Sequence, residues 1–199
     1  MYNKNKEMII VIQINDFISY LPKQKEPLSA EVFFINYNNK TYIYDVGNGD
    51  CYVDVINQIE NKYIILSHFH PDHIYNINKL TNYTLYQSKN TAKYTKIEEY
   101  KKELDEDIKI YEIPSSHAKG CLVLEYGNYL FVGDALYKSN KGLYNVNALN
   151  AQIKLLKKES IHYVICSHRE PLIRNKEDVL KELEYIYSKR NKTEPYIEV

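Results

Sequence analysis

Short apolar runs separated by polar turns cover most of the chain, and this pattern predicts a mixture of strands and helices. The runs that predict strands lie at 8–14, 30–37, 41–46, 63–66, 84–86, 108–113, 121–126, 129–132 and 163–166. Helical periodicity predicts helices over 52–59, 71–77, 147–158 and 176–190. It also predicts a charged helix whose apolar stripe is Tyr94, Ile97, Tyr100 and Leu104. Strands mixed with helices throughout indicate the α/β or α+β class.

Turn residues divide this pattern further. Asn38-Asn39 and Gly127-Asn128 each lie between two strand-like runs, so each predicts a hairpin. Residues 15–29 contain Pro22 and Pro27, and we expect a loop or flap there. We find no repeat or linker, and 199 residues suit one domain with a sizeable core, so we expect a single domain over 1–199.

The stretch with the clearest chemistry directly follows the apolar run 63–66. It reads H-x-H-x-D-H, with ligand-type side chains at His68, His70, Asp72 and His73. Side chains alternate along extended backbone, so His68 and His70 point the same way, while Pro71 suits the start of a helix carrying the other two. One histidine near a strand end is usually structural. The full pattern arises by chance in roughly one chain of this composition in several thousand, so we interpret it as a metal site.

Two ligands in each pair do not hold a metal, so further ligands must come from elsewhere in the chain. Four other residues with suitable side chains come directly after an apolar run or within a few residues of one: Asp45, His117, Asp134 and His168. Loops at strand ends are where a site is assembled from distant sequence. We therefore expect these residues to meet the H-x-H-x-D-H stretch.

Together these residues resemble the five motifs of the metallo-β-lactamase fold hydrolases, in the order of that family and over nearly the whole chain. Asp45 resembles the first motif, the H-x-H-x-D-H stretch the second, His117 the third, Asp134 the fourth and His168 the fifth. The resemblance implies a four-layer αββα sandwich with metals at one edge of its two sheets.

The resemblance also implies a ligand set for two divalent ions. The first ion would be held by His68, His70 and His117, the second by Asp72, His73 and His168, with Asp134 bridging them. Imidazole and carboxylate ligands without thiolate favour Zn²⁺, with Mn²⁺ or Fe²⁺ as alternatives. Asp45 would orient a ligand or a loop, the alternative being a turn cap. His162 matches no motif, and we interpret it as structural.

In such a centre two metals share a water, lower its pKa and present hydroxide to a scissile bond, while Asp72 or Asp134 handles the proton. The implied function is a metal-dependent hydrolase acting on a small ester, thioester or lactone, in the glyoxalase II-like or lactonase-like branch. Tyr137, three residues after Asp134, resembles a lactonase tyrosine that polarises the substrate carbonyl; a core or surface role is the alternative. Ile74-Tyr75-Asn76 departs from the small residues usual after the motif, which changes the expected pocket.

Other functions of the same fold suit these residues less well. An RNA phosphodiesterase is disfavoured because 26 basic and 26 acidic residues leave no net charge, and no basic stripe is evident. In diiron oxidases of the fold a glutamate typically stands at the position of His70, which disfavours an iron-dependent redox member. β-Lactamases use a cysteine at the second metal, where this chain has Asp134 as the bridging ligand. The full ligand set argues against a non-catalytic domain.

Cysteine usage and the N-terminus bear on the compartment. Cys51, Cys121 and Cys166 are scattered, which favours a reducing compartment. The apolar run at 8–12 is too short for a signal peptide or a membrane span. We therefore expect a cytoplasmic protein with a small-molecule substrate and no nucleic-acid or membrane partner, its oligomeric state being left open.

Overall fold

The structure, a computed structural model, describes residues 10–98 and 104–199. These residues form two compact units. The first unit holds the described residues up to Leu66 together with His70–Tyr86, and the second holds Ser67–Phe69 and the described residues from Gln87 onward. The single domain expected over 1–199 stays a prediction.

The first unit is built on a six-stranded sheet whose strands follow one another in chain order. Its strands are β1 (Ile12–Gln13), β2 (Ile18–Leu21), β3 (Val32–Tyr37), β4 (Lys40–Tyr44), β5 (Lys62–Ile65) and β6 (Tyr83–Tyr86). The pairs from β1 to β4 are antiparallel, whereas β4, β5 and β6 are parallel. Because parallel neighbours need a crossover, a helix lies between each pair of them in the chain.

Those crossovers are short. The helix α1 (Asp50–Asn57) connects β4 to β5 and buries Tyr52 and Ile56. The helix α2 (Pro71–Ile74) and the 3₁₀ helix η1 (Tyr75–Lys79) connect β5 to β6. Pro71 stands at the start of α2, as expected for a residue whose missing N–H and fixed φ suit a helix start.

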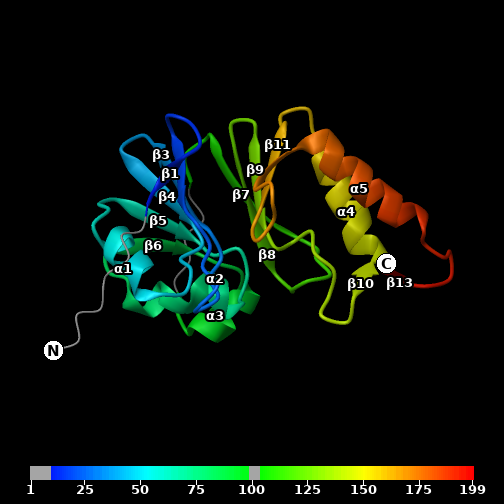
Figure 1. The fold of residues 1–199 in the computed structure, drawn as a ribbon, viewed down its shortest axis with the longest axis horizontal. Helices are drawn as coiled ribbons and strands as arrows, with labels where there is room; N and C mark the ends of the chain where they lie inside the picture. Colours follow the sequence, from blue (N-terminus) through cyan, green and yellow to red (C-terminus); the bar gives the residue numbers. More distant parts are fainter. Residues whose placement is uncertain (1–9, 99–103) are drawn as a thin grey trace. The chain divides into compact units, whose positions relative to one another are not determined.

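The second unit contains a five-stranded sheet in the order β12-β11-β9-β8-β7. Its strands are β7 (Ile108–Ile113), β8 (Cys121–Tyr126), β9 (Tyr129–Gly133), β11 (Tyr163–Cys166) and β12 (Ile173–Asn175), and a separate pair is formed by β10 (Leu143–Asn145) and β13 (Tyr196–Glu198). The helices are α3 (Lys89–Thr95), α4 (Val146–Leu156) and α5 (Lys176–Ser188). Figure 1 shows α4 and α5 side by side, and they contact each other. Their apolar faces share one core with the sheet, as at Leu149, Leu183 and Val132.

Most expected elements are present, with a few corrections. The expected loop at 15–29 is wrong in part, because 18–21 pairs with β3 as β2 despite the prolines that follow it. The expected charged helix is also misplaced. The side chain of Ser88 accepts a hydrogen bond from Thr91 N and starts α3, and Lys96 in the left-handed conformation ends it, so Ile97 and Leu104 lie outside the helix. Tyr100 and residues 8 and 9 of the first expected strand lie outside the described residues.

The strands β10, β12 and β13 were not expected. Each has only three residues, too few for a period-two pattern to be recognised in the sequence. Among the helices that the structure describes, none is both long enough and apolar enough to cross a membrane.

Candidate metal centre

Ligand-type residues of the first unit gather where two parallel strands end. Asp45 follows β4, and its backbone N–H donates to the carbonyl of Ile65 at the end of β5 (2.8 Å). After β5 the chain reaches α2, which carries Asp72 and His73 in its first turn, with His70 as the residue before the helix. We call Asp45, His70, Asp72 and His73 the first half-site.

The geometry of this half-site suits a metal ligand held in one orientation. His73 Nδ1 lies 2.7 Å from Asp45 Oδ2, and both side chains are fully buried. His73 Nε2 lies 3.5 Å from Asp72 Oδ2. Ligand atoms about 2.1 Å from one tetrahedral ion lie about 3.4 Å apart, so this pair has the spacing of neighbours on a single ion. A carboxylate on the other ring nitrogen is the usual way to orient a metal-binding histidine.

The backbone around Asp45 is shaped for this contact. Asp45 has φ +62°, a conformation that costs an L-residue about 1–3 kcal/mol and tends to occur at functional sites. The N–H groups of Val46 and Gly47 both donate to the carbonyl of His73, at 2.9 and 3.1 Å. At Gly47, with φ +65°, a Cβ atom would lie 2.6 Å from Ser29 Oγ. Glycine therefore lets the Asp45 loop close on His73.

Topology places the ligand-type residues of the second unit at one edge of its sheet. The strand β8 is antiparallel to both β7 and β9, and β11 is parallel to β9. Hence β7, β9 and β11 run in one direction and end at the same edge. His117, Asp134 and His168 follow these three ends in turn, and the N–H of Ser167 donates to the carbonyl of Gly133 across that edge (3.1 Å).

With His68, these residues form the second half-site. His117 Nε2 lies 3.3 Å from Asp134 Oδ2, and His168 Nε2 lies 4.0 Å from the same oxygen. The first distance matches the spacing of neighbouring ligands on one ion, and the oxygen between two imidazoles suits a shared ligand. The ring centroids of His68 and His117 are 5.1 Å apart. Ser67 Oγ lies 3.0 Å from His68 Nδ1 and orients that ring.

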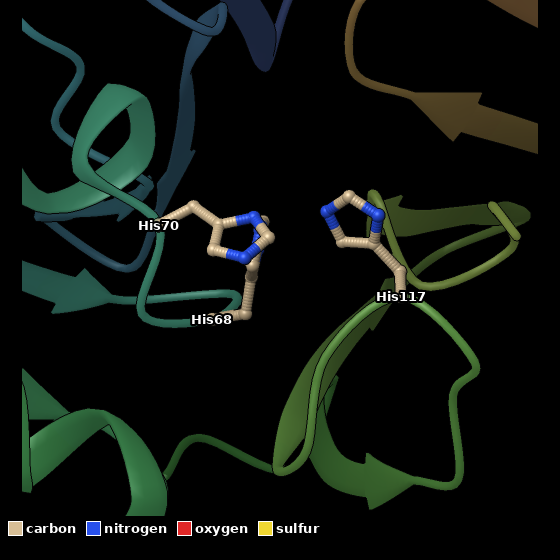
Figure 2. A group of neighbouring side chains, drawn as sticks. All are labelled: His68, His70 and His117. Carbon is tan, nitrogen blue, oxygen red and sulfur yellow. The ribbon is translucent and has the colours of Figure 1, made fainter. Parts of the chain in front are cut away.

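The chain itself connects the two half-sites. Figure 2 shows His68 and His117, which belong to the second half-site, together with His70 of the first. Only Phe69 separates His68 from His70, so their Cα atoms lie within about 7 Å of each other whatever the fold. His162, for which no role at the site was expected, follows none of these strand ends and is exposed before β11.

Tyr137 lies beside the second half-site, but its hydroxyl is engaged within the protein. The hydroxyl donates to the backbone carbonyl of Ser167 (2.6 Å), next to His168, which has φ +63°. Burial, with a further contribution from Asp134, raises the pKa of Tyr137, so the hydroxyl keeps its proton at neutral pH. The guanidinium of Arg169 lies 5.1 Å from the centre of the tyrosine ring. Donation from Tyr137 to a substrate stays a prediction, and the observed contact braces the His168 turn.

Several residues that support these loops were not identified in the sequence. Glu182 on α5 binds Arg169 and Arg174 at 3.2 and 2.8 Å, and Gln152 on α4 contacts the loops of His117 and Asp134. They lie at ordinary positions of α4 and α5, outside the ligand loops, so no sequence signal distinguishes them.

The cysteines near the site are poor ligands. Burial raises the pKa of the Cys166 thiol to about 12, so it stays protonated at neutral pH. Cys121 is also buried, and its thiol donates to the carbonyl of Ala118. Because a thiol binds metal as the thiolate, these buried thiols leave imidazole and carboxylate groups as the candidate ligands of the second half-site.

A groove of about 1010 Å³ opens beside His117 within the second unit. Its walls include Phe69, whose ring stacks on Tyr94 with the centroids 4.3 Å apart. Lys119 and Lys141 also line it. The volume is at the upper end of the range of small-molecule sites, so the groove can receive a compact substrate next to a candidate ligand.

Comparison with known proteins bears on the fold. No protein-family model matches the sequence, and no curated protein matches it. A metallo-β-lactamase from Hirschia baltica matches in structure with a TM-score of 0.68 and 15% identity, over 90% of this chain and 97% of that one. The DIM-1 metallo-β-lactamase matches with a TM-score of 0.68 and 14% identity, over 90% and 97%. A flavoprotein from Thermotoga maritima matches with a TM-score of 0.69 and 15% identity, and the match covers 93% of this chain and 62% of that longer one.

These likenesses confirm the expected fold class: the chain has the metallo-β-lactamase fold. Proteins with this fold include metallo-β-lactamases and a flavo di-iron protein. At about 15% identity the likeness concerns the fold alone, so substrate and chemistry must be argued from the site.

Proposed function

We propose that this protein is a dinuclear metal-dependent hydrolase that cleaves a small ester, thioester or lactone. The observation that carries the proposal is the spacing of donor atoms within each half-site. Asp72 and His73 are 3.5 Å apart in one, His117 and Asp134 are 3.3 Å apart in the other, and each distance suits two ligands of one ion. A ligand set of five histidines and two aspartates, without a thiolate, also suits Zn²⁺ best, with Mn²⁺ or Fe²⁺ as alternatives.

The assignment of ligands follows the motif order. His68, His70 and His117 would hold one ion, Asp72, His73 and His168 the other, and Asp134 would bridge them. Asp45 would act through His73 by fixing its ring orientation. Ser67 would do the same for His68.

Two divalent ions supply Lewis acidity and lower the pKa of a coordinated water toward neutrality. The protein's own groups would complete the reaction. A carboxylate oxygen of Asp134 or Asp72 would accept the proton from the attacking water and return it to the leaving group. The adjacent groove would hold the substrate; Lys119, Lys141 and Glu112 line it, so positive side chains exceed negative ones and would favour a neutral or anionic acyl group over a cationic one.

An iron-dependent redox function is the second candidate, because the flavo di-iron protein from Thermotoga maritima has the same fold. The present chain spans 63% of that protein. His70, at a position where diiron oxidases typically have glutamate, favours hydrolysis. Oxygen consumption with reduced flavin, measured on the iron-loaded protein, would distinguish the two.

The proposal is tested by metal content and by a substrate panel. We expect the protein, stripped with chelator and reloaded with Zn²⁺, to bind about two ions per chain and to hydrolyse a thioester or a lactone faster than a phosphodiester. His117→Ala should lose metal and activity, whereas His162→Ala, at an exposed histidine outside the site, should lose neither. One ion or fewer with full activity would contradict the dinuclear centre.

A further inference from the structure

A buried glutamine on α4 connects the two ligand loops of the second half-site. Gln152 is only 2% exposed. Its side-chain amide Nε2 donates to the carbonyl of Pro114 at 2.9 Å and to that of Ala135 at 2.8 Å. Pro114 begins the loop that carries His117, and Ala135 directly follows Asp134. One amide group thus bonds to both loops, and its two hydrogens suffice for the two bonds.

Ser115 adds a second connection between the same loops. Its hydroxyl donates to the carbonyl of Ala135 at 2.8 Å and accepts from the N–H of His117 at 3.0 Å. The carbonyl of Ala135 therefore receives one hydrogen bond from the helix and one from the neighbouring loop, which uses both of its lone pairs.

The first residues of the α4 region hold the same loop from another side. Asn145, whose side chain caps α4 by accepting from the N–H of Ala148, donates its own N–H to Ser116 Oγ at 2.8 Å. The loop before His117 is thus anchored to the start of α4 and, through Gln152, to a position two turns later. Because α4 is packed in the core, these anchors place the loop on a rigid element.

From these contacts we propose that Gln152 is a positioning residue of the metal centre, which sets the separation of His117 and Asp134. The inference rests on the proposed function, because it assumes that both residues bind metal. The two side chains lie 3.3 Å apart, and the loops that carry them are bonded to each other through the carbonyl of Ala135. A side chain that served packing alone would need no such bonds. The Gln152 amide instead donates both of its hydrogens to the loops that carry candidate ligands.

The test compares metal binding by four variants. Gln152→Leu removes both hydrogen bonds, Gln152→Glu keeps the shape while replacing the donor with an acceptor, and Ser115→Ala removes the second connection. Gln87→Leu is the matched control, because Gln87 is also a buried glutamine with two hydrogen bonds, to Ile97 and Thr95, neither a ligand-type residue. Titration with Zn²⁺ gives affinity, and the visible spectrum of the Co²⁺ form reports ligand geometry.

We expect both Gln152 variants to bind Zn²⁺ about 10–100-fold more weakly and to show an altered Co²⁺ spectrum, which is the usual scale for losing a group that orients ligands. Ser115→Ala should show a smaller change of the same kind. Gln87→Leu should lower the thermal midpoint while leaving affinity and spectrum unchanged. If Gln152→Leu does not fold, Gln152→Glu and Ser115→Ala decide the matter.

Two results would count against the inference, and they differ in what else they contradict. Wild-type metal affinity and spectrum in the folded Gln152 variants would overturn the positioning role and leave the hydrolase proposal intact. A wild-type protein that binds no Zn²⁺ or Co²⁺ would overturn the proposed function and the positioning role together. A weakening of equal size in Gln87→Leu would assign the effect to general loss of packing and also overturn the role.

Discussion

Removing one oxygen atom from Tyr137 separates a structural role from a catalytic one. The phenylalanine variant keeps the ring beneath Arg169 and loses only the hydroxyl that donates to Ser167. That bond holds the turn in which His168 adopts φ +63°. We therefore expect Tyr137→Phe to loosen the turn and to weaken binding of the metal that His168 would hold under the proposed function.

The size of the effect follows from the contact. The hydrogen bond is 2.6 Å long and part-buried, and its loss leaves the carbonyl of Ser167 without this donor. Loss of such a bond costs about 1–3 kcal/mol of unfolding free energy. For a chain of this size each kilocalorie per mole lowers the midpoint by about 2–4 °C, so we expect a fall of about 2–12 °C.

The assay combines thermal unfolding of the metal-free protein with steady-state kinetics on the best ester or lactone. Tyr129→Phe is a matched control. That tyrosine stacks its ring on Tyr163 in the same unit, and it does not come shortly after a candidate metal ligand in the chain. If Tyr137→Phe leaves the midpoint unchanged but lowers kcat by about 10–10³-fold, the hydroxyl serves the transition state instead. The bracing role of the hydroxyl would then be refuted, and the lactonase-like interpretation of Tyr137 would hold.

The remaining predictions concern two carboxylates. Because Asp134 is the proposed bridging ligand, Asp134→Asn should lose the second-site metal and lower turnover by roughly 10²-fold or more, whereas Asp105→Asn should do little; metal analysis and kinetics check both. Burial alone would raise the pKa of Glu182, but the bonds from Arg174 and Arg169 outweigh it and lower that pKa. The Glu182 carboxylate therefore stabilises the fold at pH values above its pKa in the unfolded chain, which is about 4.3. This stabilisation is lost as the pH falls through the lower pKa of the folded state. Urea unfolding should show Glu182→Gln less stable than wild type by about 1 kcal/mol at pH 7, with the gap closing as the pH falls through the lowered pKa; a constant gap would contradict this.

Local rules were sufficient for much of the protein. Short apolar runs located β7, β8 and β11, and the residue types in the turns located both hairpins. The start of α2 followed from Pro71 alone. These features depend on neighbours within a few residues, so the sequence itself determines them. The same holds for the close spacing of His68, His70, Asp72 and His73.

Tertiary structure decided which distant residues meet. That His117, Asp134 and His168 share an edge depends on β7, β9 and β11 running in one direction, which pairing energies between remote strands set. The contact of Asp45 with His73 and the bonds of Gln152 likewise depend on packing across many residues. A periodic pattern of apolar residues shows that one face of an element is buried. It does not show which other element packs against that face, because hydrophobic burial is non-directional. The orientation of these groups therefore became known only with the fold.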